Sequence, residues 1–227
     1  METESPTRGA AGRDPAQREP SQREPMFNAP WPPVLLAALI LLAYAVQSAG
    51  PDAALALRLG LSGARVRGGD LSGLITSLFV HLNWTHALGS AAFALAFGAP
   101  ISRRMGAGAQ GAMMFFVFYM ACGIFSGLAF AANHWDSPQI VVGASGALAG
   151  CMGAASRLLG RPTGLAPFTS PTVLSMAGAW LVIKLVYGAL LAGADLGISP
   201  LSWEAQLAGY AAGLLLIGPV LGLMGRA

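Results

Sequence analysis

Long apolar stretches bounded by arginines constrain this chain more than any other feature. Charged residues make up 10% of the 227 residues, and apolar residues make up 55%. The charges gather at the ends of the apolar stretches, which have about the length needed to cross a hydrocarbon core of roughly 30 Å. Six stretches are therefore predicted to span a membrane: Trp31–Ala49, Trp84–Ile101, Gly111–Ala132, Ser145–Leu159, Thr172–Ala192 and Glu204–Met224.

The same stretches indicate the secondary structure. Lipid offers no partners for backbone N–H and C=O groups, so a spanning segment must satisfy them within a helix or a closed barrel. None of the six stretches alternates between polar and apolar residues as a barrel strand does. The prediction is an all-α polytopic membrane protein, a bundle of six transmembrane helices.

The arginines predict the orientation. With six spans and a cytoplasmic N-terminus, the outside loops carry three arginines and the inside segments carry nine, an excess that the positive-inside rule favours. Both termini are thus expected in the cytoplasm. The net charge of +3 follows from this bias and gives no argument for a nucleic-acid partner. The inside residues are Arg8, Arg13, Arg18, Arg23, Arg103, Arg104, Arg157, Arg161 and Arg226, and the outside ones are Arg58, Arg65 and Arg67.

Residues 1–28 differ in composition from the rest. They are rich in Pro, Arg, Glu and Gln and contain a tandem repeat, residues 16–20 followed by residues 21–25. Such a segment lacks the apolar area to fold, so a disordered cytoplasmic tail is predicted, followed by one six-span domain over residues 29–227. A cleaved signal peptide centred on Val34–Val46 is the alternative, but the leader before it is long and acidic.

No metal or other cofactor is predicted. Cys122 and Cys151 fall inside predicted spans and form no disulfide or zinc pattern, so they are expected to be small apolar fillers. Metal binding by His81, His86 and His134 is the alternative, although their spacing is not that of a zinc-binding helix.

The loop after the first span, Gly50–Gly73, has its own pattern. Leucines recur at every second position from Leu55 to Leu61, with Arg58 and Arg65 nearby. An element with apolar and basic sides can lie in the headgroup region, so a partly embedded outer loop is predicted. An ordinary exposed loop is the alternative.

The segment Gly143-Ala144-Ser145-Gly146 places a serine at the start of the fourth apolar stretch. A serine hydroxyl is a poor nucleophile until a neighbouring base removes its proton. The flanking glycines allow backbone to approach closely, and free N–H groups at a helix N-terminus can bind a developing oxyanion. Tight helix packing alone is the other explanation of this segment.

Small residues also predict which helices touch. Gly146, Gly150 and Gly153 form one small face, and Gly209 and Gly213, four residues apart, form another on the sixth stretch. Such faces allow two helices to pack closely. The fourth and sixth helices are therefore expected to meet, with Ser145 near Gln206.

Two histidines stand at the outer end of the second stretch. His86 and Ser90 are four residues apart and share a helix face, and His81 is expected in the preceding turn. Histidine at membrane depth usually faces protein or water. A packed, hydrogen-bonded histidine is the structural alternative to a functional one.

Taken together, residues 29–227 resemble the rhomboid family of intramembrane serine proteases. The resemblance rests on His81, His86 and Ser90 with their spacing, on Ala96-Phe97-Gly98, on Gly143-Ala144-Ser145-Gly146, and on Trp203-Glu204-Ala205-Gln206-Leu207-Ala208-Gly209 with Gly213. It implies a six-helix core with the serine in a water-filled cavity below the outer surface. It also implies that Ser145 is the nucleophile and His86 an oxyanion donor.

The chain departs from the family pattern at two important positions. Gln206 stands where the family has its catalytic histidine, and Ser90 stands where it has a second oxyanion donor, asparagine. Ala208 replaces a common glycine. An amide cannot act as a base near neutral pH, so Gln206 cannot take the proton from Ser145. Loss of the histidine costs about a millionfold in a well-studied serine protease, and loss of one oxyanion donor costs about 10²–10³-fold.

These departures favour a pseudoprotease, a rhomboid homologue that contacts membrane lipid and binds transmembrane segments of client proteins. An active serine endopeptidase with a substitute base is the alternative. Lys184, in the fifth stretch, is the named candidate for that base, and His134 is a weaker one. Lys184 could instead snorkel or pair with Glu204. A transport or channel-like component is the third class. The compact plan fits a bacterial inner membrane.

Overall fold

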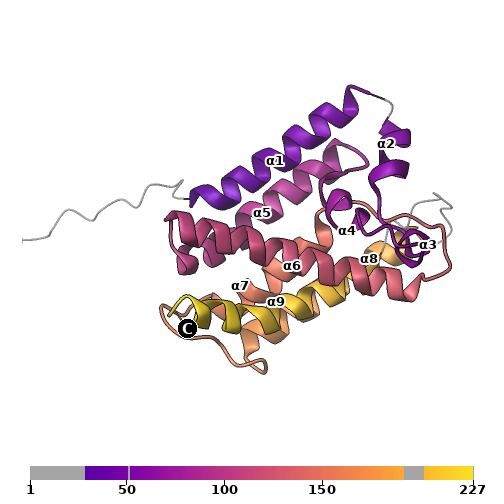
Figure 1. The fold of residues 1–227 in the computed structure, drawn as a ribbon. Helices are drawn as coiled ribbons and strands as arrows, with labels where there is room; N and C mark the ends of the chain where they lie inside the picture. Colours follow the sequence, from indigo (N-terminus) through magenta and orange to yellow (C-terminus); the bar gives the residue numbers. More distant parts are fainter. Residues whose placement is uncertain (1–28, 51, 192–201, 227) are drawn as a thin grey trace, which may run out of the picture.

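The computed structural model describes residues 29–50, 52–191 and 202–226. The predicted tail at residues 1–28 lies outside the described residues. Six long helices follow one another in the described part, and each starts within two residues of the position that the apolar pattern predicts (Figure 1). They are α1 (Trp31–Ser48), α5 (Trp84–Met105), α6 (Ala109–Asn133), α7 (Ser145–Leu158), α8 (Pro171–Leu191) and α9 (Trp203–Leu223).

The two ends of the bundle differ in structure. The start of α1 and the end of α9 lie at the same end (Figure 1). Short elements gather at the opposite end, between α1 and α5, where the sequence predicts only a loop. These are α2 (Asp52–Leu59), α3 (Gly63–Arg67), α4 (Gly73–Thr76) and the short 3-10 turn η2 (Ser77–Phe79).

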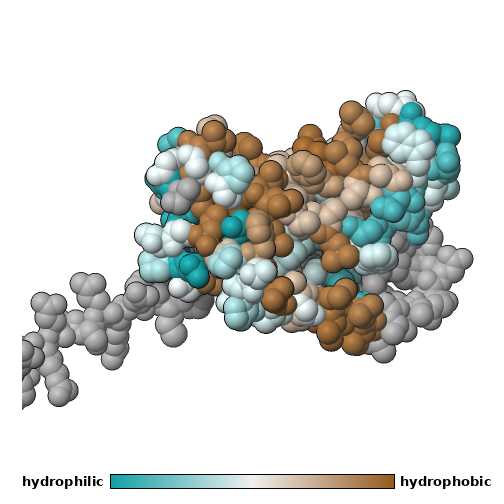
Figure 2. Space-filling view, turned by 90° about the horizontal axis from the view of Figure 1, so that it is seen from below, coloured by the Kyte–Doolittle hydropathy of each residue, from teal (hydrophilic) through white to brown (hydrophobic). Residues whose placement is uncertain are grey.

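The surface and the helix lengths suit a bilayer. Among the described helices, α1, α6 and α9 are long and apolar enough to cross a membrane, and α8 contributes a shorter apolar helix over Pro171–Val186. Apolar side chains cover much of the face drawn in Figure 2, with hydrophilic ones toward its two ends. The chain is thus an integral membrane protein, an all-α helical bundle, while the count of six spans stays a prediction.

Helix α7 lies at the centre of the bundle. It packs against α5, α6, α8 and α9, and it is built largely from Gly, Ala and other small residues. Nearly all of its side chains are buried, including Cys151, and Cys122 of α6 is buried beside it. The apolar filler role predicted for the two cysteines agrees with this burial.

Glycines bring α7 and α9 into backbone contact. A Cβ added at Gly209 would clash with the carbonyl oxygen of Gly146, and one added at Gly213 would clash with that of Gly150. Only hydrogen fits at these two positions of α9, which is how small residues allow membrane helices to approach closely. The packing of these two helices, predicted from the glycine spacing, is confirmed.

We call α2, α3, α4 and η2 the outer-end elements, after the orientation predicted from the arginines. One arginine holds them together. Arg65 forms an ion pair with Asp70, and its Nη1 donates to the carbonyl oxygens of Arg58, at 2.8 Å, and Gly60, at 3.0 Å. Leu61 and Val141 then form an isolated antiparallel bridge through two backbone hydrogen bonds. The bridge ties this region to the segment that leads into α7.

Candidate functional site

Ser145 and Gln206 are joined by a hydrogen bond. Ser145 is the first residue of α7, Gln206 lies in the first turn of α9, and the Gln206 Nε2 donates to the Ser145 Oγ at 3.2 Å. The Gln206 side chain is only 5% exposed. Its Oε1 is buried and has no hydrogen-bond partner among the described residues. The pair therefore has one amide oxygen still able to accept a hydrogen bond.

The chemistry of this pair follows from the amide. A carboxamide donates through its nitrogen and accepts through its oxygen, and neither atom is basic near neutral pH. The Ser145 oxygen accepts the hydrogen bond from Gln206, and its own proton has no base beside it within that pair. The contact holds the serine in place without activating it as a nucleophile.

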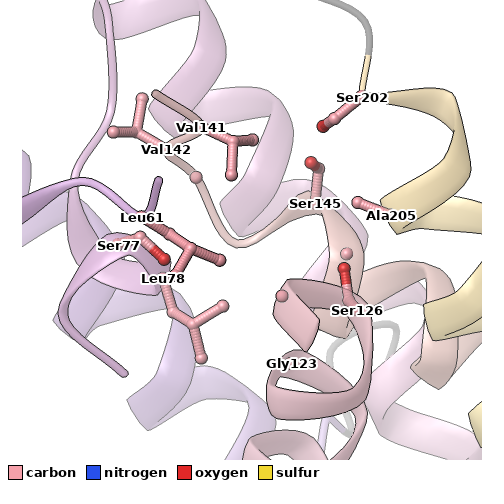
Figure 3. A pocket seen from close by; sticks show the side chains of 13 residues that line it. Leu61, Ser77, Leu78, Gly123, Ser126, Val141, Val142, Ser145, Ser202 and Ala205 are labelled. Atoms are coloured by element: carbon pink, nitrogen blue, oxygen red, sulfur yellow. The ribbon is translucent and has the colours of Figure 1, made fainter. Parts of the chain in front are cut away.

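A small pocket opens beside Ser145. Its cavity volume is about 20 Å³, enough for one water molecule. The side chains of Ser145 and Ser202 extend toward each other across this space, with Ala205 of α9 nearby (Figure 3). Glycines and apolar side chains from several elements line the pocket. Four serines also line it: Ser77, Ser126, Ser145 and Ser202.

His86 lies against the backbone just before Ser145. Asn83 caps α5, because its Oδ1 accepts from the His86 N–H at 2.8 Å. Gly143 has a φ of +113°, and a Cβ added to it would lie only 2.6 Å from the His86 ring. The Gly143 N–H donates to the Ser77 carbonyl oxygen at 2.8 Å. Glycine at 143 is therefore required both by its backbone conformation and by the imidazole beside it.

His81 lies behind His86 and is completely buried. The two imidazole rings meet edge to face, with their centroids 4.9 Å apart. Neither ring nitrogen of His81 has a hydrogen-bond partner among the described residues. Burial, with a smaller contribution from the neighbouring His86, lowers the pKa of His81 to about 4. The ring is consequently neutral at physiological pH.

Gln47 of α1 holds the backbone of His81. Its Nε2 donates to the His81 carbonyl oxygen at 2.6 Å, and its Oε1 accepts from the His81 N–H at 3.1 Å. Sequence reasoning missed this residue. A single polar residue at the end of an apolar stretch was the available signal, because polar groups at membrane depth usually have a specific partner.

Ser90 is buried one helical turn after His86, on α5. It is not among the residues that line the pocket beside Ser145. Among the described residues, the Ser145 hydroxyl accepts a hydrogen bond from Gln206 and not from Ser90. An oxyanion role for His86 and Ser90 stays a prediction.

His134 and Glu204 form a second polar contact near the pocket. The His134 Nδ1 lies 3.5 Å from the Glu204 Oε1 and 3.1 Å from the Phe130 carbonyl oxygen. The contact joins the end of α6 to the first turn of α9, two residues before Gln206. The sequence suggested Glu204 as a partner of Lys184, but in the structure its carboxylate lies against the His134 ring.

Lys184 lies on α8, which packs against α7. Its Nζ sits 4.4 Å from the centre of the Trp180 ring, a cation–π contact. No hydrogen bond joins Lys184 to Ser145 in the part of the chain that the structure describes. Its proposed use as a substitute base stays a prediction, and the described contacts offer it no support.

A comparison of the sequence with models of known protein families gives a match. The model of the Rhomboid domain matches residues 68–222, which is more than half of the chain. The chain belongs to the rhomboid family. A comparison with curated proteins gave no match.

The rhomboid match extends from the end of α3 nearly to the end of α9. It includes Ser145, Gln206 and both histidines of the candidate site. Gln47 and α1 lie before it, although Gln47 binds the backbone of His81. The rhomboid bundle, its membrane character and its contact with lipid are therefore established, whereas the roles of single site residues remain to be tested.

Proposed function

We propose that this rhomboid protein has no serine protease activity and instead binds transmembrane segments of other membrane proteins. The hydrogen bond between Gln206 and Ser145 is the observation that carries this proposal. Gln206 occupies the position near the serine where a base would be needed, and a carboxamide cannot accept the serine proton. The hydroxyl therefore remains a weak nucleophile.

The surroundings of Ser145 support the same conclusion. The imidazole of His134 is directed to Glu204 and to the Phe130 carbonyl oxygen. The ammonium of Lys184 lies over Trp180. His86 lies against Gly143. None of these contacts joins a basic group to the serine hydroxyl, so they do not favour an active enzyme with a substitute base.

Binding of a transmembrane segment is supported by the polarity of the pocket. The serines around it offer donors and acceptors at the start of a buried helix. A client segment whose helix is broken has unpaired backbone groups, which are costly in lipid. The pocket has room for one such group, for example a single backbone carbonyl, whereas a continuous apolar helix has no free backbone group to offer.

The wider arrangement belongs to the same proposal. Residues 29–227 form one membrane domain of six spans preceded by a cytoplasmic tail. Both termini lie in the cytoplasm, because the arginines are more numerous on that side. The protein resides in a bacterial inner membrane.

Labelling with a fluorophosphonate probe tests the loss of activity. The purified, detergent-solubilised protein is compared with Ser145→Ala, Gln206→His and the double variant Gln206→His/Ser90→Asn, with thermal unfolding measured for each. We expect no Ser145-dependent labelling of folded wild-type protein. Ser145-dependent labelling would overturn the proposal, and its loss in Lys184→Met would identify that lysine as the base.

Client binding is tested separately. We expect Ser145→Ala to retain the binding of a single-span client peptide in nanodiscs, because the hydroxyl is not used as a nucleophile. Substitution of Gly213 by Leu should abolish binding, since the added side chain would push α9 away from Gly150 of α7. Absence of any binding to helix-broken peptides by folded wild-type protein would refute the client-binding part of the proposal.

A further inference from the structure

Lys184 is a positive charge inside an apolar helix surface. Its neighbours Leu181, Val182, Ile183, Leu185 and Val186 are all exposed on the surface of α8, whereas Lys184 is half-buried. Ionisable residues within membrane segments are expensive, and they usually face protein or water and have a partner of opposite charge. Lys184 is therefore expected to have a partner of negative charge.

No carboxylate serves as that partner in the part of the chain that the structure describes. None of the ion pairs found there includes Lys184. The sequences of α5, α7 and α8 contain neither Asp nor Glu. Glu204, the nearest described acid in the sequence, faces His134. Trp180 stabilises the ammonium through its ring face, which leaves the three N–H donors of Lys184 able to bind an anion.

Trp180 supplies a second, independent observation. Its side chain is 8% exposed, and its Nε1 is buried without a hydrogen-bond acceptor among the described residues. The other face of this aromatic cluster belongs to α5, where Phe93 packs against Trp180 with ring centroids 5.7 Å apart. The same indole ring is thus fixed by packing on one side and contacts the lysine charge, so it holds the ammonium in a defined position.

Lys184 and Ser145 lie at similar depths. Helices α7 and α8 follow one another and pack together. Ser145 is thirteen positions before Leu158 at the end of α7, and Lys184 is thirteen positions after Pro171 at the start of α8. At about 1.5 Å per residue, each distance is about 20 Å.

We infer that Lys184 and Trp180 form a recognition site for a client transmembrane helix that carries an aspartate or glutamate in the outer half of its span. This inference rests on the proposed function and names the class of client. The carboxylate of the client pairs with the Lys184 ammonium, which the Trp180 ring holds in place. The two opposite charges are then paired, and neither is exposed alone to lipid. Charged groups within membranes are usually paired in this way.

Three matched single-span peptides test this inference. They share an apolar sequence with the same helix-breaking residue, and they carry Asp, Asn or Leu at one position in the outer half. Affinities for the full chain in nanodiscs are measured by fluorescence energy transfer. We expect the Asp peptide to bind wild type about 5- to 30-fold more tightly than the Leu peptide, the range for interhelical polar contacts in model peptides.

Four variants assign the preference to the named side chains. Lys184→Met should reduce the preference for Asp to less than about twofold, and Trp180→Phe should largely keep it because an aromatic ring face remains to hold the ammonium. In the Lys184→Met background, Leu185→Lys moves the charge to the exposed face and should not restore the preference. Lys184→Glu should prefer a peptide with Lys at the same position.

The outcomes separate this inference from the proposed function. Equal, measurable binding of the Asp and Leu peptides to wild type would overturn the inference and leave client binding intact. Retention of the Asp preference in folded Lys184→Met would also overturn it. Binding of no peptide at all would instead refute client binding itself. Preference for Asp, lost in Lys184→Met and reversed in Lys184→Glu, would establish the site.

Discussion

Gln47 and His81 are joined through both main-chain groups of the histidine. The glutamine side chain donates to the His81 carbonyl oxygen at 2.6 Å and accepts from its N–H at 3.1 Å. This residue of α1 therefore satisfies the non-helical backbone that precedes α5. Through the ring contacts from His81 to His86, and from His86 to Gly143, it also supports the segment that leads to Ser145.

Replacement of Gln47 by Leu should destabilise the protein by about 2–5 kcal/mol, because two buried backbone groups lose their partners. The change is measured by thermal unfolding in detergent. Gln139→Leu is the matched control, since the Gln139 side chain is partly exposed. Equal melting temperatures for the two variants would contradict the assigned role of Gln47.

Replacement of Gly213 by Ala should cost about 1–3 kcal/mol, because the added methyl group meets the Gly150 carbonyl oxygen. Gly222, on the same helix α9, has open space around its Cα. Gly222→Ala should therefore be neutral or stabilising by up to about 1 kcal/mol, through its higher helix propensity. Unfolding temperatures of the two variants decide the matter, and a similar loss in both would argue against close contact of α7 with α9.

Replacement of Gly143 by Ala should destabilise by about 1–3 kcal/mol and displace the His86 ring, since both the φ of +113° and the ring contact oppose a Cβ. Gly164→Ala is the control, because Gly164 also has a positive φ, of +67°, but nothing within 4 Å of its added Cβ. Modification of His86 by diethylpyrocarbonate, followed by mass spectrometry, should rise only in Gly143→Ala. An unchanged rate there would show that the ring does not depend on Gly143.

Stability should decrease as the pH falls from about 6.5 to about 4, because the folded state lowers the pKa of His81 to about 4 from a value near 6.5. The unfolded chain takes up a proton in this window and the folded chain does not, so protonation favours unfolding. His81→Phe should give a shallower dependence of melting temperature on pH over the same window. Identical slopes would show that His81 is not the group responsible.

The outer-end elements should respond to acid at a lower pH. Hydrogen bonds from the Ser72 side chain, and then from Arg65, lower the pKa of Asp70 from 3.8 to about 2. The stability that its carboxylate contributes is complete above about pH 3.8 and is lost as the pH falls through about 2. Carbon-13 titration of the Asp70 carboxyl should give a midpoint near 2, and Arg65→Gln should move it toward 3.8.

The sequence predicted the long helices closely because their signal is strong. The start of α7 at Ser145 and of α5 at Trp84 are as predicted, since a glycine-rich segment and the Asn83 cap mark them. Helix α5 continues past Ile101 to Met105 despite Pro100, because its last turn remains covered by neighbouring helices. The contact between Ser145 and Gln206 followed from glycine spacing on two helices.

The missed features depend on contacts between distant segments. The two hydrogen bonds of Gln47, the contact of His134 with Glu204, and the bridge of Leu61 with Val141 each join residues far apart in the chain. Periodicity within one segment carries no information about such pairs. The short helices α2 to α4 were missed for a related reason: each has few residues, and neighbouring contacts hold its conformation.

The Leu61–Val141 bridge makes the outer end sensitive to chain length. Val141 belongs to extended backbone that approaches α7, a helix of 14 residues that measures only about 21 Å. Extended backbone within a membrane is unfavourable unless its N–H and C=O groups are hydrogen-bonded. Leu61 forms these hydrogen bonds with Val141. A one-residue deletion between Leu59 and Ser62 would shift this register and strip Val141 of its partners. Surface loops usually tolerate such deletions, but the segment from Leu59 to Ser62 should not. This sensitivity does not require any contact with the Ser145 hydroxyl.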